Sequence, residues 1–124
     1  MPMTELVVRK IEAQEMPDLN SYVVVLAERD DGSGARIELQ RALEFDEQDI
    51  RLGMDTYSIG TESGATCYGG IESHALGGGE LIIELDRKAS ETLGIGPKIL
   101  CKLMVNADEV AALHAGLDRV LGRN

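Results

Sequence analysis

The apolar positions of this chain follow a period of two residues over most of its length. The strongest strand signal is residues 20–29, NSYVVVLAER, whose middle is uninterrupted apolar and β-branched, as in a central strand covered on both faces. After the turn DDGSG at 30–34, Ile37 and Leu39 alternate with charged and polar residues, which predicts a hairpin partner. A short helix is the alternative because Leu39 and Leu43 lie four residues apart, but so short a turn favours the hairpin.

Alternating apolar residues predict further strands in the rest of the chain. One strand covers residues 6–11, two antiparallel strands lie within 55–76 around the TESGA at 61–65, and the last two cover 80–86 and 97–105. The side chains expected to point inward from the last two are Leu81, Ile83 and Leu85, then Ile99, Cys101, Leu103 and Val105. Gly69 and Gly70 fall inside a strand pattern, which suggests a bulge or a tight bend, and the three glycines at 77–79 predict a turn.

Two segments have the periodicity and the end signals of helices. Residues 86–94 predict a short helix that Asp86 caps. Residues 106–122 predict a longer, C-terminal helix, in which Asn106 and Glu109 have the spacing of a capping box. The apolar stripe of this helix consists of Val110, Leu113, Leu117, Val120 and Leu121.

The expected fold is therefore α+β. It is a mainly antiparallel, curved sheet of about seven strands, with a short helix and a C-terminal amphipathic helix packed on one face. Short turns link most of the strands, which favours antiparallel pairing. Since no internal repeat, linker or low-complexity tract interrupts the chain, residues 1–124 are expected to form one domain.

The charge of the chain narrows the choice of partners. Its 124 residues include 22 acidic and 12 basic side chains, for a formal net charge of −10. Nucleic acids and anionic membranes would be repelled, whereas a basic protein would be attracted and steered. The chain has no Trp and one Phe, which also argues against a base-stacking surface. Solubility alone also explains an acidic surface.

The cysteines and the N-terminal residues carry no sign of a metal site or of export. Cys67 and Cys101 are the only cysteines, and their spacing forms neither a CxxC pair nor a zinc set, so no metal and no cofactor is expected. The N-terminal MPMTELVVRKIEAQ has no apolar signal core, and no stretch approaches a membrane span. We therefore expect a cytoplasmic protein.

The densest cluster of charge is the stretch DEQDIRLGMDTY at 46–57, in which Arg51 is the one basic residue. This region is too short and too charged for a strand, and it predicts one helical turn that closes near Gly53. Its carboxylates do not have the order of a calcium loop, and a glycosidase pair is unsupported without aromatic sugar platforms. Two interpretations remain: a solvated turn, or a recognition edge that fills the basic cleft of another protein. The candidate partner-binding residues are Glu44, Asp46, Glu47, Asp49 and Asp55.

Catalytic chemistry finds little support in the sequence. His74 and His114 belong to no recognisable metal or nucleophile motif, and the glycine-rich YGGIESHALGGG contains neither GxGxxG nor GK[ST]. No catalytic residue is therefore assigned. The rival hypothesis is a small metal-dependent or acid–base enzyme that uses His74 and nearby carboxylates. It requires a pocket that holds His74 and at least two carboxylates within hydrogen-bond reach.

The stretch LEFDEQDIRLGMDTYSI at 43–59 and the CYGGI that follows it resemble the immunity protein 10 family of bacterial polymorphic toxin systems. The matching elements are DEQD at 46–49, GMDTY at 53–57 and YGGI at 68–71. A weaker match continues through ELIIELDRKASETLGI to the final strand and helix, so the resemblance covers most of the chain. The family carries Cys directly after its DTY, where this chain has Ser58, so a thiol is not required at that position.

The resemblance implies a non-enzymatic inhibitor that binds a cognate toxin domain and blocks it. A basic toxin cleft, such as that of a nuclease, would suit the candidate carboxylates. The motif residues assigned to the scaffold are Gly53, Tyr57, Tyr68, Gly69 and Gly70. A self-associating adaptor domain, a homodimer joined through its strand edges, is the third hypothesis.

Overall fold

The computed structural model describes residues 3–52 and 56–121, without the side chain of Asp49. The strands in these ranges are β1 Met3–Val8, β2 Lys10–Met16, β3 Ser21–Ala27, β4 Arg36–Ala42, β5 Ser58–Thr61, β6 Thr66–Tyr68, β7 Ile71–Gly77, β8 Glu80–Leu85 and β9 Lys98–Leu103. The helices are the 3-10 helix η1 Pro17–Leu19 and the α-helices α1 Glu47–Arg51, α2 Arg87–Leu93 and α3 Ala107–Leu121. Within the described ranges, none of these helices has the length and apolar character needed to cross a membrane.

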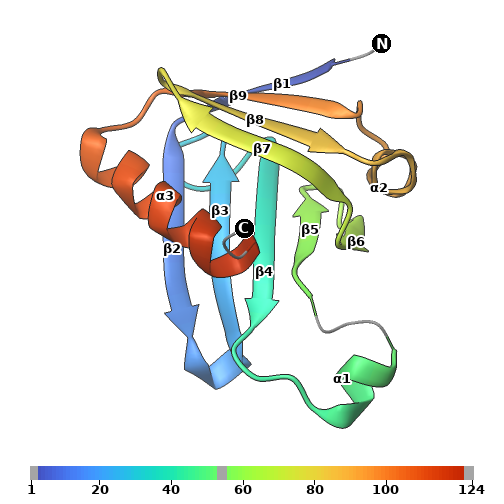
Figure 1. Cartoon of the computed structure of the whole chain (residues 1–124). Coiled ribbons are helices and arrows are strands. Elements are labelled where there is room, and N and C mark those ends of the chain that lie inside the picture. Colours follow the sequence, from blue (N-terminus) through green and yellow to red (C-terminus); the bar gives the residue numbers. More distant parts are fainter. Residues whose placement is uncertain (1–2, 53–55, 122–124) are drawn as a thin grey trace.

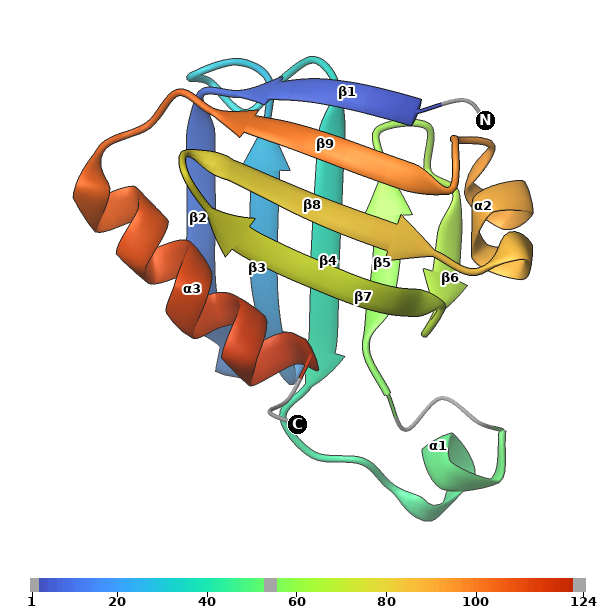
Figure 2. The ribbon, with the colours of Figure 1, turned by 45° about the horizontal axis from the view of Figure 1, so that its top comes forward.

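The strands form two sheets that lie face to face with their strands crossing (Figures 1 and 2). One sheet has four strands in the order β1-β9-β8-β7, and the other has five in the order β2-β3-β4-β5-β6. All neighbouring strands pair antiparallel except β1 and β9, which are parallel. The α+β class and the mainly antiparallel pairing are confirmed, with the described strands divided between two sheets where the sequence predicted one.

The first change of sheet lies near the N-terminus, and there the sequence-based prediction of one strand at 6–11 is wrong. β1 ends at Val8, and β2 starts two residues later in the other sheet. Leu6 and Val8 are buried with the spacing of a strand, but the next buried residue, Ile11, comes three positions on. The alternation of buried and exposed residues is therefore broken at Arg9, where the chain crosses from one sheet to the other.

The second change of sheet lies at Gly69–Gly70, between β6 and β7. Both glycines have positive φ, 72° and 96°, a region that costs glycine little. The tight bend expected here is present, and it carries the chain from the five-stranded sheet to the four-stranded one. The single strand predicted after TESGA, up to residue 76, is therefore wrong, because this bend divides it into β6 and β7.

The other strand predictions are confirmed. β3 and β4 pair antiparallel across the turn at 30–34, which excludes the short helix as the alternative. The inward residues predicted for the last two strands are buried: Leu81, Ile83, Leu85, Ile99, Cys101 and Leu103. Val105, which follows the end of β9, is half-buried.

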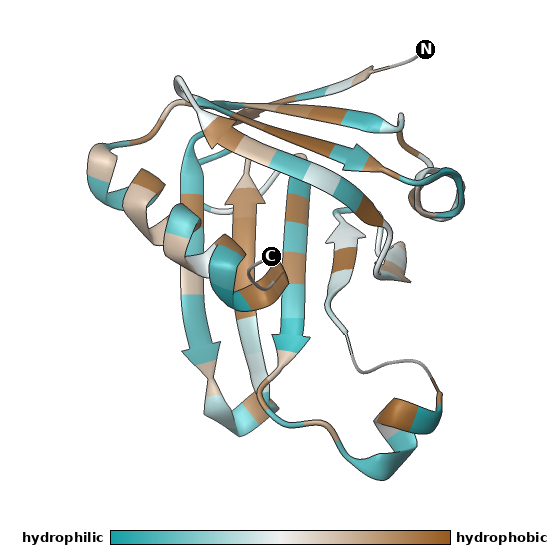
Figure 3. Cartoon of the chain, in the orientation of Figure 1, coloured by the Kyte–Doolittle hydropathy of each residue, from teal (hydrophilic) through white to brown (hydrophobic). Residues whose placement is uncertain are grey.

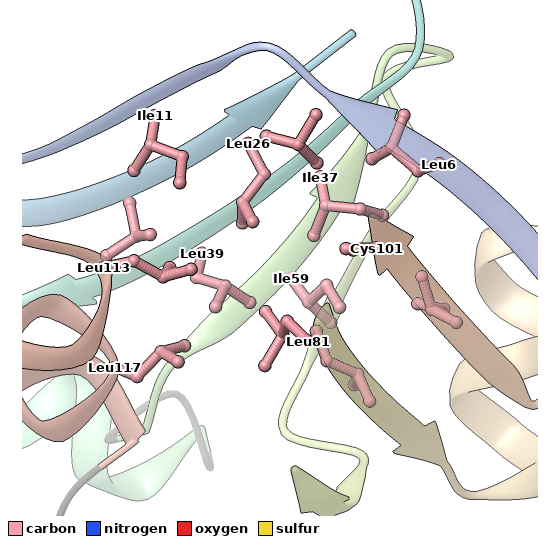
Figure 4. Close-up of a cluster of buried hydrophobic side chains, with 14 of the residues drawn as sticks. Leu6, Ile11, Leu26, Ile37, Leu39, Ile59, Leu81, Cys101, Leu113 and Leu117 are labelled. Carbon is pink, nitrogen blue, oxygen red and sulfur yellow. The ribbon is translucent and has the colours of Figure 1, made fainter. Parts of the chain in front are cut away.

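One cluster of buried aliphatic side chains lies between the two sheets (Figure 4). In Figure 3 the hydrophobic colour is concentrated on the strands that contribute to it, such as β3 and β8. Helix α3 packs on one face of a sheet, as predicted; this is the five-stranded sheet, over β2 and β3, where it buries Leu113, Leu117 and Val120. Gly116 lets the helix approach closely, since a Cβ there would lie 2.8 Å from Val24 Cγ2.

Both predicted helix caps are present. Asp86 Oδ1 accepts the N–H of Ala89 at 2.8 Å, and Asn106 Oδ1 accepts the N–H of Glu109 at 2.8 Å. The carboxylate of Glu109 accepts the N–H of Ile11 at 3.3 Å. This bond gives Glu109 a role beyond its own helix, because it ties the first turn of α3 to β2.

Candidate partner-binding site

Residues 43–52, which we call the acidic arm, leave the body of the molecule after β4. Figures 1 and 2 both show α1 beyond the ends of the strands and away from both sheets. The N–H of Leu52 donates to the carbonyl of Gln48 at 3.0 Å, within the helical turn that the sequence predicted. The closure of that turn near Gly53 lies outside the described residues.

The base of the acidic arm is held by Asn20, which follows η1. Asn20 has a left-handed φ of 51°, a conformation that Asn adopts more readily than most residues. Its Nδ2 donates to the carbonyl of Glu44 at 3.0 Å, and its Oδ1 accepts the N–H of Glu44 at 3.1 Å. The carbonyl of Asn20 accepts the N–H of Leu43 at 3.0 Å. These three bonds, the Asn20 clamp, fix the direction in which the arm leaves the body.

A cation–π contact adds to the anchoring of the arm. The guanidinium carbon of Arg41 lies 5.5 Å from the centroid of the Phe45 ring. Arg41 also donates from Nη1 to the carbonyl of Val120, near the end of α3, at 3.2 Å. Arg41 therefore links the start of the arm to the C-terminal helix, while Asn20 links it to the β2–β3 connection.

Three of the predicted partner-binding side chains are exposed on the acidic arm: Glu44, Asp46 and Glu47. The predicted Asp49 lies within α1, but its side chain and the whole of Asp55 are outside the described part. The short, anchored segment therefore carries three exposed carboxylates beyond the ends of the strands. Over residues 3–52 and 56–121, no group of three or more His, Cys, Asp or Glu side chains is placed to hold a metal ion.

Two aliphatic side chains of the arm were not among the predicted site residues. Ile50 is 57% exposed and Leu52 is 61% exposed. Figure 3 shows hydrophobic colour on α1, well away from the core. A sequence signal for this exposure exists, because Asp46 and Glu47 stand four and three residues before Ile50. The face of the helical turn that carries Ile50 is therefore charged, and it offers no apolar stripe that would pack on a sheet.

Tyr57 holds the chain where it crosses between the sheets. Its phenol oxygen accepts the N–H of Ile71 at 2.8 Å, and its carbonyl accepts the N–H of Gly69 at 2.9 Å. Burial is the main cause that raises the pKa of the Tyr57 phenol above its ordinary value. The two hydrogen bonds join both sides of the glycine bend to a single residue.

Gly70 allows α2 to pack against this bend. A Cβ at Gly70 would lie 2.5 Å from the Cβ of Ala89, inside the distance that real atoms keep. The carbonyl of Gly70 accepts the N–H of Asp86, the capping residue of α2, at 2.8 Å. Tyr68, in contrast, is 50% exposed on the short edge strand β6.

His74 lines a pocket of about 250 Å³ beside β7. The residues that line it are Tyr57, Ile71, Glu72, Ser73, His74 and Leu121. Glu72 supplies the one carboxylate in this described lining. The enzyme hypothesis required at least two carboxylates around His74, so the lining of this pocket does not meet its requirement.

The protein is therefore an α+β protein with two sheets, from which the acidic arm projects. The family model described as immunity protein 10 matches residues 7–111 of the chain. The chain therefore belongs to the immunity protein 10 family, and the resemblance seen in its motifs is confirmed. No curated protein and no solved structure matches the chain.

Proposed function

We propose that this chain is an immunity protein that binds a cognate bacterial toxin domain and neutralises it by covering it with the acidic arm. Family membership supports the immunity role. The observation that carries the acidic surface is the presence of exposed Glu44, Asp46 and Glu47 on a segment whose base Asn20 clamps. A segment held in place before binding loses less conformational entropy in the complex than a mobile one.

The partner that suits this surface is a basic toxin domain. A net charge of −10 attracts such a domain over a long range, and the arm gives the encounter a preferred orientation. Exposed ion pairs contribute only about 0–1 kcal/mol each to binding. The carboxylates of the arm therefore act mainly on the rate and direction of association.

Inhibition of this kind needs no catalytic residue, metal or cofactor in the chain itself. The acidic arm would cover the toxin in the cytoplasm of the cell that it protects. The bonds made by Tyr57 and the close approach at Gly70 support a scaffold role for these residues of the family motif. Gly53, Tyr68 and Gly69 are assigned to the same scaffold.

Charge reversal on the arm tests the proposal. The arm variant is Glu44→Lys with Glu47→Lys. The control is Glu12→Lys with Asp30→Lys, which makes the same change in net charge at two exposed positions of the five-stranded sheet and the β3–β4 turn. This turn lies at the end of the β3–β4 hairpin opposite the arm.

The binding partner in this experiment is the purified toxin domain that we expect a neighbouring reading frame to encode. At low salt, we expect the arm variant to associate roughly tenfold more slowly than wild type, and the control to stay within about threefold. Equal rates for the two variants would contradict the role of the arm. Failure of the wild-type chain to protect cells that express the toxin domain would contradict inhibition itself.

A further inference from the structure

We propose that Ile50 and Leu52 form the apolar centre of the contact with the toxin, and that the carboxylates of the arm form its rim. This inference rests on the proposed function and specifies how the arm binds. Its starting point is the combination of two large exposed aliphatic side chains, 57% and 61% accessible, with a segment that extends away from both sheets. A single exposed aliphatic residue is ordinary, but two on a projecting segment need a partner surface to be buried.

Half of the large exposed hydrophobic residues of the described chain lie on the arm or at its base. Leu19, which is 67% exposed, precedes the Asn20 of the clamp. Together with Ile50 and Leu52 it accounts for three of the large exposed hydrophobic residues, which also include Met3, Tyr68 and Met104. Figures 1 and 2 both place the β2–β3 connection and α1 at the same end of the five-stranded sheet. The apolar contact would therefore extend from the arm toward its base.

Charge decides what covers this apolar pair. Glu44, Asp46 and Glu47 lie within six residues of Ile50 on the same arm. A second copy of the chain that docked arm to arm would bring these carboxylates against their own equivalents, and each copy carries a net charge of −10. An anionic membrane would be repelled for the same reason. The occupant that satisfies both features is a basic protein surface with an apolar depression at its centre.

The two kinds of side chain then have separable effects on binding. Carboxylates at the rim speed association in a way that depends on salt. Aliphatic side chains that enter a dry pocket slow dissociation, and central buried anchors dominate the affinity of many interfaces. The Asn20 clamp contributes by holding the arm before the encounter, so that little ordering is required afterwards.

The test compares Ile50→Ser with Leu52→Ser against the control Met3→Ser with Met104→Ser. Both Met residues are also exposed, at 46% and 65%, and they lie on or next to the other sheet. With the same toxin domain, we expect the arm variant to dissociate roughly 100-fold faster, since each anchor contributes about tenfold. Its association rate and the salt dependence of that rate should stay within about threefold of wild type. The control should dissociate like wild type.

The outcomes separate this inference from the proposed function. A wild-type chain that binds the toxin, with unchanged dissociation in the arm variant, overturns the apolar centre and leaves the charged arm in place. A wild-type chain that does not bind the toxin overturns the proposed function. Sedimentation of the chain alone tests whether a second copy covers the apolar pair instead. If the wild-type chain is a dimer and the variant Ile50→Ser with Leu52→Ser is a monomer, the pair binds a second copy and the inference is overturned.

Discussion

The phenol oxygen of Tyr57 accepts the backbone N–H of Ile71 at 2.8 Å. Tyr57 directly precedes β5 in one sheet and Ile71 begins β7 in the other, so this bond joins the two sheets across the glycine bend. Tyr57→Phe removes the phenol oxygen and leaves the half-buried N–H of Ile71 without this hydrogen-bond acceptor. We expect the free energy of unfolding in urea to fall by about 1–3 kcal/mol. Tyr68→Phe, at an exposed ring, should change it by less than about 0.5 kcal/mol, and equal losses would contradict the special role of Tyr57.

Gly70 should tolerate a methyl group much less well than Gly64. Both have positive φ, 96° and 89°, so Ala strains the backbone at either position. A Cβ at Gly64 meets nothing within 4 Å, whereas one at Gly70 lies 2.5 Å from Ala89 Cβ. Gly64→Ala should lower the free energy of unfolding by about 1–2 kcal/mol, and Gly70→Ala by a further 1–3 kcal/mol or so. Matching thermal unfolding curves for the two variants would show that the contact with α2 is not tight.

Cys101 should make the stability of the fold fall at alkaline pH. Burial raises the pKa of its thiol to about 12, while the unfolded chain has an ordinary cysteine. Above an ordinary thiol pKa of about 8.5, the unfolded state loses this proton and the folded state keeps it, so unfolding is favoured as pH rises toward 12. The full stabilisation is present at lower pH and declines by up to about 1.4 kcal/mol per pH unit.

Cys101→Val isolates that effect, because Val fills a similar apolar volume and does not titrate. Urea unfolding between neutral pH and pH 10.5 should show a shallower loss for this variant than for wild type. The raised pKa of Tyr57 acts in the same direction above pH 10 in both proteins and cancels in the comparison. Identical slopes would mean that Cys101 ionises as easily in the folded chain as in the unfolded one.

The Asn20 clamp should be visible in amide exchange. Asn20→Gly keeps the left-handed φ accessible but removes the two side-chain bonds to Glu44, while the backbone bond to Leu43 remains. A lost hydrogen bond contributes about 1 kcal/mol, so the Glu44 amide should exchange roughly fivefold faster. The Leu43 amide is the internal control and should keep its protection. Faster exchange of both amides alike would indicate that the whole base of the arm opens without the side chain.

The regular elements of the fold were predictable because burial imposes a simple period on them. Leu81, Ile83 and Leu85 alternate along β8, and Leu113 and Leu117 follow the helical spacing along α3. The division into two sheets was harder to predict. Both sheets bury their apolar side chains in the same core, and at Arg9 the apolar pattern shifts by only one position. Sequence periodicity reports which side chains are buried, and it does not report which sheet buries them.

The candidate site was predictable in its charge and less so in its shape. Counting carboxylates located the arm, since Glu44, Asp46 and Glu47 are neighbours in sequence. The anchoring by Asn20 depends on a contact between residues 24 positions apart, which no local pattern encodes. The charges of Asp46 and Glu47 indicate that Ile50 is exposed, whereas the exposure of Leu52 follows from where the arm leaves the five-stranded sheet.

The parallel pairing of β1 with β9 joins two strands that lie far apart in the sequence, with Met3 opposite Lys98. During synthesis β1 must therefore wait for β9, through about 5–20 s at roughly 5–20 residues per second. Contacts so distant along the chain also close slowly. In the proposed role, protection would depend on molecules that finished folding before the toxin arrived, because newly started chains need this time before β1 can pair with β9.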